Sequence, residues 1–419
     1  MSNTETNMDG YKKTKLGWIP EEWDFIKMGE KVDLLTGYPF SSNSYSNKGI
    51  RLLRGANIKR GELSWGDDIT VYWDNHFDKL DKFELRLGDL VIAMDGSLVG
   101  RSFAQVNSSD LPSYLLQRVA RIRSEELDIN FLKHLISSMH FVRYCDSVKT
   151  VTAIPHISSK DLNNFSIPTP SYTEQKKIAE ILSTWDEAIQ KTEALIKKKE
   201  RLKKGLMQQL LTGKRRLPGF NDKWREVKLG KLISTFSGGT PSRQKQEYYN
   251  GSIPWIKSGE LNQRRIHTTE EKISSEALAK SSAKLVHKGA LLLAIYGATA
   301  GVISVNMMSS AAINQAILAL IPLDNKIDIG FLELWFLYNK DKIIHTFTQG
   351  GQPNLSAKIV KSLKLNCPSI EEQKRISRLL FAIEDDIQGL KVLSDCIKSQ
   401  KKGLMQQLLT GKTRVKVNK

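Results

Sequence analysis

The sequence predicts an α+β protein in which one unit, a globular domain followed by a long helix, is written twice. Residues 203–214 recur without a change as residues 401–412, at an offset of 198 positions. At the same offset the tripeptide Glu-Gln-Lys at 174–176 recurs at 372–374. Solenoid repeats have periods of about 20 to 50 residues. A period of nearly half the chain, used twice, instead indicates duplication of a whole domain with its helix.

The globular parts of the two halves align more loosely. Trp23 corresponds to Trp224, and glycines at 88, 96 and 100 fall 201 positions before glycines at 289, 297 and 301. Further on, Pro155 corresponds to Pro353. Framework positions match while the residues between them differ, as expected of two copies of one fold that carry different surfaces.

Each globular part has the pattern of an α+β domain. Residues 1–10 are polar and are expected to be disordered. Residues 11–170 contain β-rich runs at 89–94 and 117–122 and a helical stretch at 129–142, and residues 216–368 contain the equivalent runs at 289–295 and 315–321 and a helix at 329–342. Gly-x-x-x-Gly at 96–100 and at 297–301 favours a tight turn between strands.

The two long helices are predicted within residues 171–215 and 369–419, and each carries one apolar stripe. Steps of four and three residues separate the apolar positions, which is coiled-coil spacing. Leu202 and Leu393 are expected to extend the stripes, and each pattern ends at Thr-Gly-Lys, where glycine suits the left-handed conformation after a helix. The positions expected to pair the helices are Ile178, Leu182, Trp185, Ile189, Leu206, Leu210, Ile376, Leu380, Ile383, Ile387, Leu404 and Leu408.

A helix with a single apolar stripe must bury that stripe, and each helix has one equivalent partner in the chain. Because the helices are related by duplication, antiparallel pairing predicts a pseudo-twofold dumbbell with one domain at each end. About 38 residues at 1.5 Å per residue make a spacer of about 57 Å.

The charge balance indicates the kind of partner. A formal net charge of +18 over 419 residues favours a polyanion or an acidic membrane surface. No apolar run approaches the roughly 20 residues that span a bilayer, and the first residues lack the apolar core of a signal peptide. We therefore expect a cytoplasmic protein that binds nucleic acid and no membrane. Cys145, Cys367 and Cys396 are too widely spaced for a disulfide framework or a zinc site.

The order of domain, repeat helix, domain and repeat helix resembles the DNA specificity subunit of type I restriction-modification systems over nearly the whole chain. The resemblance rests on Glu-Gln-Lys-(Lys/Arg)-Ile at 174–178 and 372–376, and on Gly-Leu-Met-Gln-Gln-Leu-Leu-Thr-Gly at 205–213 and 403–411. The second domain adds Gly-Gly-Thr-Pro-Ser at 238–242 and Ile-Pro-Trp-Ile-Lys at 253–257, from which residues 36–40 and 52–54 of the first domain depart.

This resemblance implies two target recognition domains, each of which reads one half of a bipartite sequence in double-stranded DNA. It implies that the helices set the spacing of the halves and dock two modification (methyltransferase) subunits, with restriction subunits joining the complex. It also implies that this chain is not an enzyme and holds no cofactor. Adenine N6 methylation with S-adenosylmethionine, and cleavage with ATP and Mg²⁺, would belong to the partners. Two readers at a fixed separation suit half-sites about one helical turn, roughly 34 Å, apart.

Loop-like clusters of polar and basic residues are the candidate DNA contacts, because such side chains read base edges and bind phosphates. For any single one, a solvated surface position is an equal alternative. In the first domain the candidates are Lys48, Arg51, Arg54, Asn57, Lys59, Arg60, Ser97, Arg101, Gln117, Arg118 and His156. In the second they are Arg243, Lys257, Ser258, Glu260, Asn262, Arg264, Arg265, Tyr296, Thr299, Asn314, Gln315, Gln352 and Asn354.

No catalytic or metal site is predicted. The Asn/Asp-Pro-Pro-aromatic tetrapeptide of adenine methyltransferases is absent, and the seven histidines form no metal-ligand spacing. Two alternatives remain. An autonomous DNA-binding protein would not copurify with a methyltransferase, and an enzyme with an unrecognised site would methylate or cleave DNA by itself.

Overall fold

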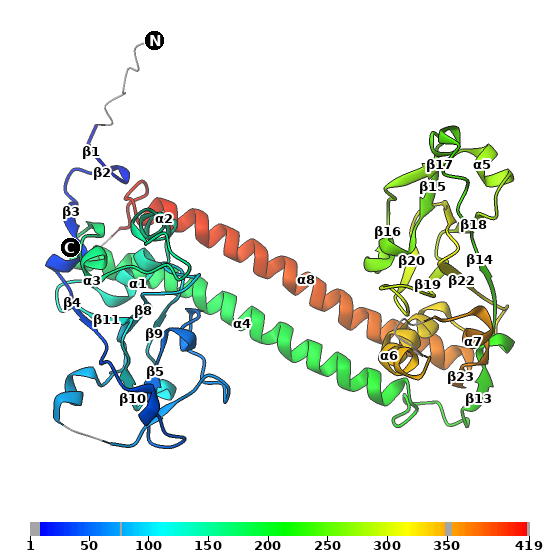
Figure 1. The fold of residues 1–419 in the computed structure, drawn as a ribbon, viewed down its shortest axis with the longest axis horizontal. Coiled ribbons are helices and arrows are strands. Elements are labelled where there is room, and N and C mark those ends of the chain that lie inside the picture. Colours follow the sequence, from blue (N-terminus) through cyan, green and yellow to red (C-terminus); the bar gives the residue numbers. More distant parts are fainter. Residues whose placement is uncertain (1–8, 76–77, 348–353, 417–419) are drawn as a thin grey trace, which may run out of the picture. The chain divides into compact units, whose positions relative to one another are not determined.

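The computed structural model describes residues 9–75, 78–347 and 354–416. The chain divides into two compact units, Met1–Glu193 with Val392–Lys419, and Ala194–Lys391. Each unit contains one globular domain, the beginning of one long helix and the end of the other (Figure 1). The predicted disordered segment 1–10 lies, except for its last two residues, outside the described residues.

The first unit holds the elements of the first domain. Its strands are β1 (Tyr11–Thr14), β2 (Gly17–Pro20), β3 (Asp24–Lys27), β4 (Asp33–Thr36), β5 (Ile50–Leu53), β6 (Arg60–Gly61), β7 (Tyr72–Trp73), β8 (Leu90–Ala93), β9 (Phe103–Gln105), β10 (Ser113–Leu115), β11 (Val119–Arg123) and β12 (Ser166–Thr169). Its helices are α1 (Ile129–Ser137), α2 (Met139–Val148), α3 (Ser159–Asn163) and the beginning of α4 (Tyr172–Leu210).

The second unit holds the corresponding elements. Its strands are β13 (Arg225–Lys228), β14 (Ile233–Ser237), β15 (Ile253–Ile256), β16 (Arg265–Ile266), β17 (Glu271–Ile273), β18 (Lys284–His287), β19 (Leu291–Ala294), β20 (Ile303–Asn306), β21 (Ser310–Ile313), β22 (Ile317–Pro322) and β23 (Lys364–Cys367). Its helices are α5 (Ser275–Ala279), α6 (Ile329–Phe347), α7 (Ala357–Ser362) and the beginning of α8 (Ile370–Leu408).

The main sheet has the same topology in both domains. Its strand order is β4-β11-β8-β9-β6 in the first domain and β14-β22-β19-β20-β16 in the second. A smaller sheet also repeats, with a parallel pair of β10 with β5 in one domain and β21 with β15 in the other. The second domain adds β18 to that sheet. The predicted α+β class with two tandem domains is therefore confirmed.

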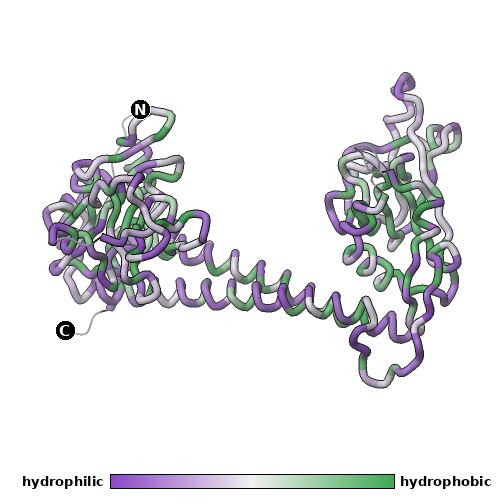
Figure 2. The backbone as a smooth tube through the Cα atoms, turned by 60° about the horizontal axis from the view of Figure 1, so that its bottom comes forward, coloured by the Kyte–Doolittle hydropathy of each residue, from purple (hydrophilic) through white to green (hydrophobic). Residues whose placement is uncertain are grey.

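Both ends of each long helix are built into a domain core. In the first unit Ile178 of α4 and Leu408 of α8 belong to the same apolar cluster as the main sheet. In the second unit Leu210 of α4 and Ile376 of α8 take the equivalent places. Figure 2 shows hydrophobic positions gathered within each globular domain and alternating with hydrophilic ones along the helices. Each domain core is thus completed by the beginning of one helix and the end of the other.

Within each unit, the segments of α4 and α8 run antiparallel, as predicted. The ion pairs between them are Asp186–Lys401 and Glu193–Lys398 in the first unit, and Glu200–Lys391 and Lys203–Glu384 in the second. Rising residue numbers on α4 thus meet falling numbers on α8. Of the predicted pairing positions, those buried are Ile178, Leu182, Leu210, Ile376, Leu380, Ile387 and Leu408, and those partly buried are Trp185, Ile189, Leu206, Ile383 and Leu404.

The predicted extension of the stripes by Leu202 and Leu393 is wrong, because these side chains are 52% and 48% exposed. Steps of three and four residues from Ile196 lead to Lys203, whose ammonium lies 3.1 Å from a carboxylate oxygen of Glu384. Leu202 is one residue, and hence about 100° around the helix, away from that position. Buried Ser394 takes the corresponding place beside Leu393.

Most predicted elements are present, with one correction. The single helical stretch expected at 129–142 is two helices, α1 and α2, which meet at Ser138. Ser138 has an extended backbone and its hydroxyl accepts from the amide of Phe141, so it caps a new helix. The predicted turns and helix ends are confirmed by left-handed glycines, with φ of +95° at Gly96 and +73° at Gly213.

Candidate DNA interface

At one end of the main sheet of the first domain, three distant segments meet. The turn after β8 pairs with the loop before α3 through a bridge between Asp95 and His156, and the Gly96 amide donates to the carbonyl of Pro155 at 2.9 Å. Just before β11, the guanidinium of Arg118 lies 3.2 Å from the Asp95 carboxylate. Arg118 has a φ of +65°, which is uncommon for a residue other than glycine. We call Asp95, Ser97, Gln117, Arg118 and His156 the first strand-end cluster.

The second domain brings the corresponding segments together. Tyr296, after β19, forms a bridge with Asn354, and the next amide, of Leu355, donates to the carbonyl of Ile295 at 2.6 Å. Before β22, the side-chain carbonyl of Gln315 accepts a hydrogen bond from the hydroxyl of Thr240. We call Thr240, Tyr296, Thr299, Gln315 and Asn354 the second strand-end cluster. Predicted site residues that are far apart in sequence are thus adjacent in both domains.

Several predicted contacts are held by carboxylates of their own domain. Arg101 makes a two-point contact with Asp146, at 2.7 and 3.2 Å. The hydrogen bond from Arg101 lowers the pKa of the Asp146 carboxyl to about 2, with a further contribution from Lys149. In the second domain Arg243 and Lys257 both bind Glu271, and their hydrogen bonds lower its pKa to about 2. These carboxylates therefore stay ionised near neutral pH.

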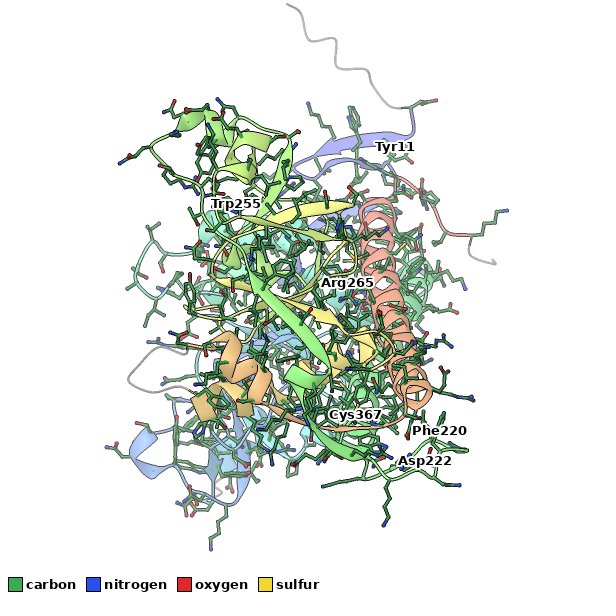
Figure 3. The ribbon with its side chains drawn as sticks, turned by 90° about the vertical axis from the view of Figure 1, so that its right-hand side faces the viewer. Tyr11, Phe220, Asp222, Trp255, Arg265 and Cys367 are labelled. Atoms are coloured by element: carbon green, nitrogen blue, oxygen red, sulfur yellow. The ribbon has the colours of Figure 1, made fainter. Side chains whose placement is uncertain are left out.

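Arg264 and Arg265 belong to a partly buried ion-pair cluster. Both guanidinium groups contact the carboxylate of Glu333 on α6, each at 2.7 Å. Arg264 also pairs with Glu384 on α8. Arg265 is labelled in Figure 3, which looks onto this domain. These two arginines tie β16 to the helices, so the structure gives them an internal role, and DNA contact by them stays a prediction.

The remaining candidates divide by exposure. Asn57, Glu260 and Asn314 serve the local backbone: Asn57 and Asn314 are buried, and the Glu260 carboxylate accepts from the amides of Lys257 and Glu270. Arg51 lies over the Trp65 ring at 4.5 Å. Exposed candidates are Lys48, Lys59, Arg60 and Asn262, and partly buried ones are Arg54 and Ser258. Gln352 lies outside the described residues.

A contact that the sequence did not predict joins each domain to the helices. In the second unit the buried carboxylate of Glu372 accepts from Arg216 at 2.6 Å twice and from the indole of Trp224 at 3.1 Å. In the first unit Glu174 accepts in the same way from Arg414 and Trp23. The sequence contained a pattern that could have predicted this contact, because Arg216 and Arg414 are separated by the same 198 positions as Glu174 and Glu372.

The glutamine that follows each of these glutamates completes the junction. The side-chain carbonyl of Gln175 accepts from the amide of Asp128, just before α1, and its amide donates to the Pro170 carbonyl. Gln373 makes the same contacts with Asp328 and Pro368. The repeated Glu-Gln pair is therefore the fixed joint between each domain and its helix.

The comparisons with known proteins agree with this duplicated architecture. A family model, described as the type I restriction modification DNA specificity domain, matches residues 20–201 and again residues 221–395. The chain belongs to this family.

Other members of the type I restriction modification DNA specificity family show what the chain is similar to. The type I restriction enzyme MjaVIII specificity subunit of Methanocaldococcus jannaschii is 31% identical over 215 residues, which is 50% of each protein. The chain therefore matches about half the length of this relative. The putative type I restriction enzyme MjaX specificity subunit of the same organism is 24% identical over 442 residues, 97% of each protein.

A solved structure of the family shows the same fold. The S subunit of a type I restriction-modification system from M. genitalium has a TM-score of 0.61 at 18% identity, over 92% of this chain and 96% of that one. Membership of this DNA specificity family confirms the predicted resemblance. The description of the family also agrees with the expected role in DNA specificity.

The repeated helix segment of this family member has an exposed side that is identical in both copies. Lys204, Gln208 and Gln209 on α4 are exposed, and so are Lys402, Gln406 and Gln407 on α8. In the second unit this side borders a groove of about 560 Å³, lined also by Leu337 and Tyr338 of α6 and Ile387 of α8. Burial does not explain why these exposed residues are the same.

Among the described residues, no helix is long and apolar enough to cross a membrane. No group of three or more His, Cys, Asp or Glu side chains among them is placed to hold a metal ion.

Proposed function

We propose that the chain is the DNA-recognition subunit of a type I restriction-modification complex in which each globular domain reads one half of a bipartite site in double-stranded DNA. The observation that carries this proposal is the pair of strand-end clusters. The same three backbone segments meet in both domains, but the equivalent positions differ: Asp95, Arg118 and His156 of the first domain correspond to Tyr296, Ala316 and Asn354 of the second. One frame with two sets of exposed polar side chains suits two different half-sites.

We further propose that two modification subunits dock on the helices, one near each copy of the repeat. Support comes from the exposed residues Lys204 and Gln208 and their identical counterparts Lys402 and Gln406. Two copies of one partner require the same surface twice. Adenine methylation with S-adenosylmethionine, and cleavage with ATP and Mg²⁺ by restriction subunits, would then take place in the partners, in the cytoplasm where bacterial and archaeal DNA is found.

A domain exchange tests this function. Residues 216–368 are replaced by the equivalent domain of another family member, and N6-methyladenine is mapped across the genome in cells that also express the cognate modification subunit. The expected wild-type motif has two short defined halves around a fixed gap, and the exchange should change one half only. A change in both halves, or a continuous motif, would contradict the two-reader proposal.

The same cells distinguish the alternatives. Cells with the modification subunit alone provide the background, in which no new motif is expected. Methylation or cleavage of DNA by the purified chain alone would favour an enzyme. DNA binding without any copurified modification subunit would favour an autonomous DNA-binding protein.

A further inference from the structure

A short loop of the first domain, residues 150–156, has a closed and hydrogen-bonded base. The Thr150 amide donates to the His156 carbonyl at 3.0 Å, and the His156 amide donates to the Thr150 hydroxyl oxygen at 3.0 Å. The same hydroxyl lies 2.9 Å from Nδ1 of His156. Inside the loop, the Thr152 hydroxyl donates to the Ile154 carbonyl at 2.7 Å. The loop therefore has a defined shape.

This loop presents aliphatic side chains to solvent. Val151 is fully exposed, at 102% of its reference area, and Ile154 is 60% exposed. Leu98, in the turn after β8, is 57% exposed. An aliphatic side chain that stays exposed on a closed loop does not stabilise the fold, because it buries no apolar surface. A cluster of such side chains therefore indicates an interaction site.

The loop ends at His156, a member of the first strand-end cluster. Its last residue, His156, forms the bridge with Asp95, and Gly96 binds Pro155, so the turn that bears Leu98 is attached to the loop. Arg118 is bound to the same Asp95, and its side chain remains 67% exposed. The aliphatic residues thus stand among the polar residues proposed to read one half-site.

The duplication indicates which partner these residues meet. At the same offset of 198 positions, the segment Val-Thr-Ala-Ile at 151–154 corresponds to Gln-Gly-Gly-Gln at 349–352. A surface for two copies of one protein partner stays the same in both halves, as Lys204 and Lys402 do on the helices. A segment whose sequence is aliphatic in one half and has no aliphatic side chain in the other suits DNA halves of different sequence.

We propose that Val151 and Ile154 contact thymine methyl groups in the half-site that the first domain reads. This inference rests on the proposed function. The thymine C5-methyl is the apolar group that the major groove offers, and aliphatic side chains select it. A half-site that contains a target adenine also contains the thymine paired with it. A thymine methyl group is therefore present whichever strand carries the adenine.

The test uses the complete complex with its modification subunits and duplexes that carry the mapped target. Thymines of one half are replaced by 2′-deoxyuridine, which removes only the methyl group. For the wild-type complex, the replacement should weaken binding about three- to fivefold for each methyl group contacted, because burying one methylene contributes about 0.8 kcal/mol. The loss should occur only when the thymines replaced lie in the half-site that the first domain reads. The double variant Val151→Ser, Ile154→Ser should bind the thymine duplex at least about tenfold more weakly and no longer distinguish it from the uracil duplex.

Leu87→Ser is the matched control. Leu87 is 69% exposed and precedes β8 at the opposite end of that strand, so its substitution should leave both affinities unchanged. The proposal is overturned if the double variant keeps wild-type affinity, or binds more weakly but still distinguishes thymine from uracil. Loss of the modification subunit from the double variant would assign the loop to a protein partner instead. If the wild-type complex yields no bipartite motif at all, the proposed function fails, and this outcome is distinct from failure of the loop alone.

Discussion

At the scale of the residue, Glu372 shows why a charge can lie buried between a helix and a domain. Its carboxylate is fully buried but accepts three hydrogen bonds, two from Arg216 and one from Trp224. A buried charge is tolerated when it is paired and its remaining lone pairs are used. Its three contacts also join the segment after α4 to the first turn of α8.

Removal of this carboxylate should destabilise the second unit. Glu372→Ala leaves the guanidinium and the indole without their acceptor, so we expect the free energy of unfolding to fall by about 2–4 kcal/mol. Urea denaturation measures this change. Glu371→Ala is the matched control, because that side chain is 71% exposed and should cost less than about 0.5 kcal/mol. Equal stability of the two variants would show that the junction does not hold the unit together.

His134 is expected to make the stability of the first unit depend on pH. Burial, with Lys401 nearby, lowers the pKa of this imidazole from its ordinary 6.5 to about 3, although the Asp186 carboxylate acts to raise it. Nε2 of the ring lies 3.3 Å from the Ser183 hydroxyl. The unfolded chain therefore takes up a proton before the folded one does. The stability present above pH 6.5 should fall as the pH drops toward 3, by about 2 kcal/mol between pH 7 and pH 5.

Denaturation of wild type and His134→Gln at several pH values measures this contribution. The variant should lose the part of the pH dependence that belongs to His134, so the two curves of unfolding free energy should converge as the pH falls. Ser183→Ala keeps the titrating ring and should retain the wild-type slope. Parallel curves for wild type and His134→Gln would mean that the imidazole titrates alike in both states.

At the scale of the element, the long helices combine a structural side and an outward side. The inward positions follow steps of three and four residues, but in the last third of α4 two of them are lysines, with Lys199 paired to Asp386 at 2.5 Å and Lys203 to Glu384. Charged pairs at such positions favour one register over its neighbours. The outward positions of the repeat are exposed and do not pair the two helices.

Substitution of the outward side should remove one docking site at a time. Lys204→Glu with Gln208→Arg should reduce the copurified modification subunits from two per chain to one, and adding Lys402→Glu with Gln406→Arg should remove both. Native mass spectrometry of the coexpressed complex gives the stoichiometry. The control is Arg201→Ser, on the same exposed side but with a different residue, Ser399, in the second copy. Two subunits retained by the fourfold variant would place docking elsewhere.

The elements were predictable to the extent that local pattern determines them. The apolar runs at 89–94 and 289–295 became β8 and β19, because strands covered on both faces are continuous apolar segments. The two-residue strands β6 and β16 were not predictable, since pairing with β9 and β20 creates them. The predicted extension of the apolar stripe to Leu202 is wrong, because Leu202 is apolar but does not lie on the inward face of the helix.

The candidate site was predictable as a set and not in its members. Arg118 and His156 were selected by residue type, and tertiary pairing brings them together. Arg264 was selected for the same reason, yet Glu333, 69 residues away in sequence, binds it. Residue type alone does not reveal which cation already has an acidic partner within its own domain.

At the scale of the whole molecule, duplication separates constraints that a single domain would mix. Residues that build the joint, such as Glu174 and Glu372, are the same in both copies and buried. The repeat residues Gln208 and Gln406 are the same and exposed. Under the proposed function, exposed positions that differ at equivalent places are available to read the two halves of the DNA. The chain thus contains an internal comparison between structural surfaces and the surfaces proposed to dock protein and to read DNA.

The net charge of +18 leads to a prediction about salt. Phosphate contacts release counterions, so for six or more contacts the affinity of the complete complex for its target should fall about a thousandfold or more between 50 and 200 mM KCl. Fluorescence anisotropy with a labelled duplex measures this dependence. Scrambling one half-site should weaken binding but leave the slope of log affinity against log salt unchanged, because base contacts release no counterions.

Arg118→Ala should behave like a scrambled half-site if Arg118 reads bases, whereas a slope reduced by about one would make Arg118 a phosphate contact. A slope near zero for wild type would show that the basic surface meets something other than DNA.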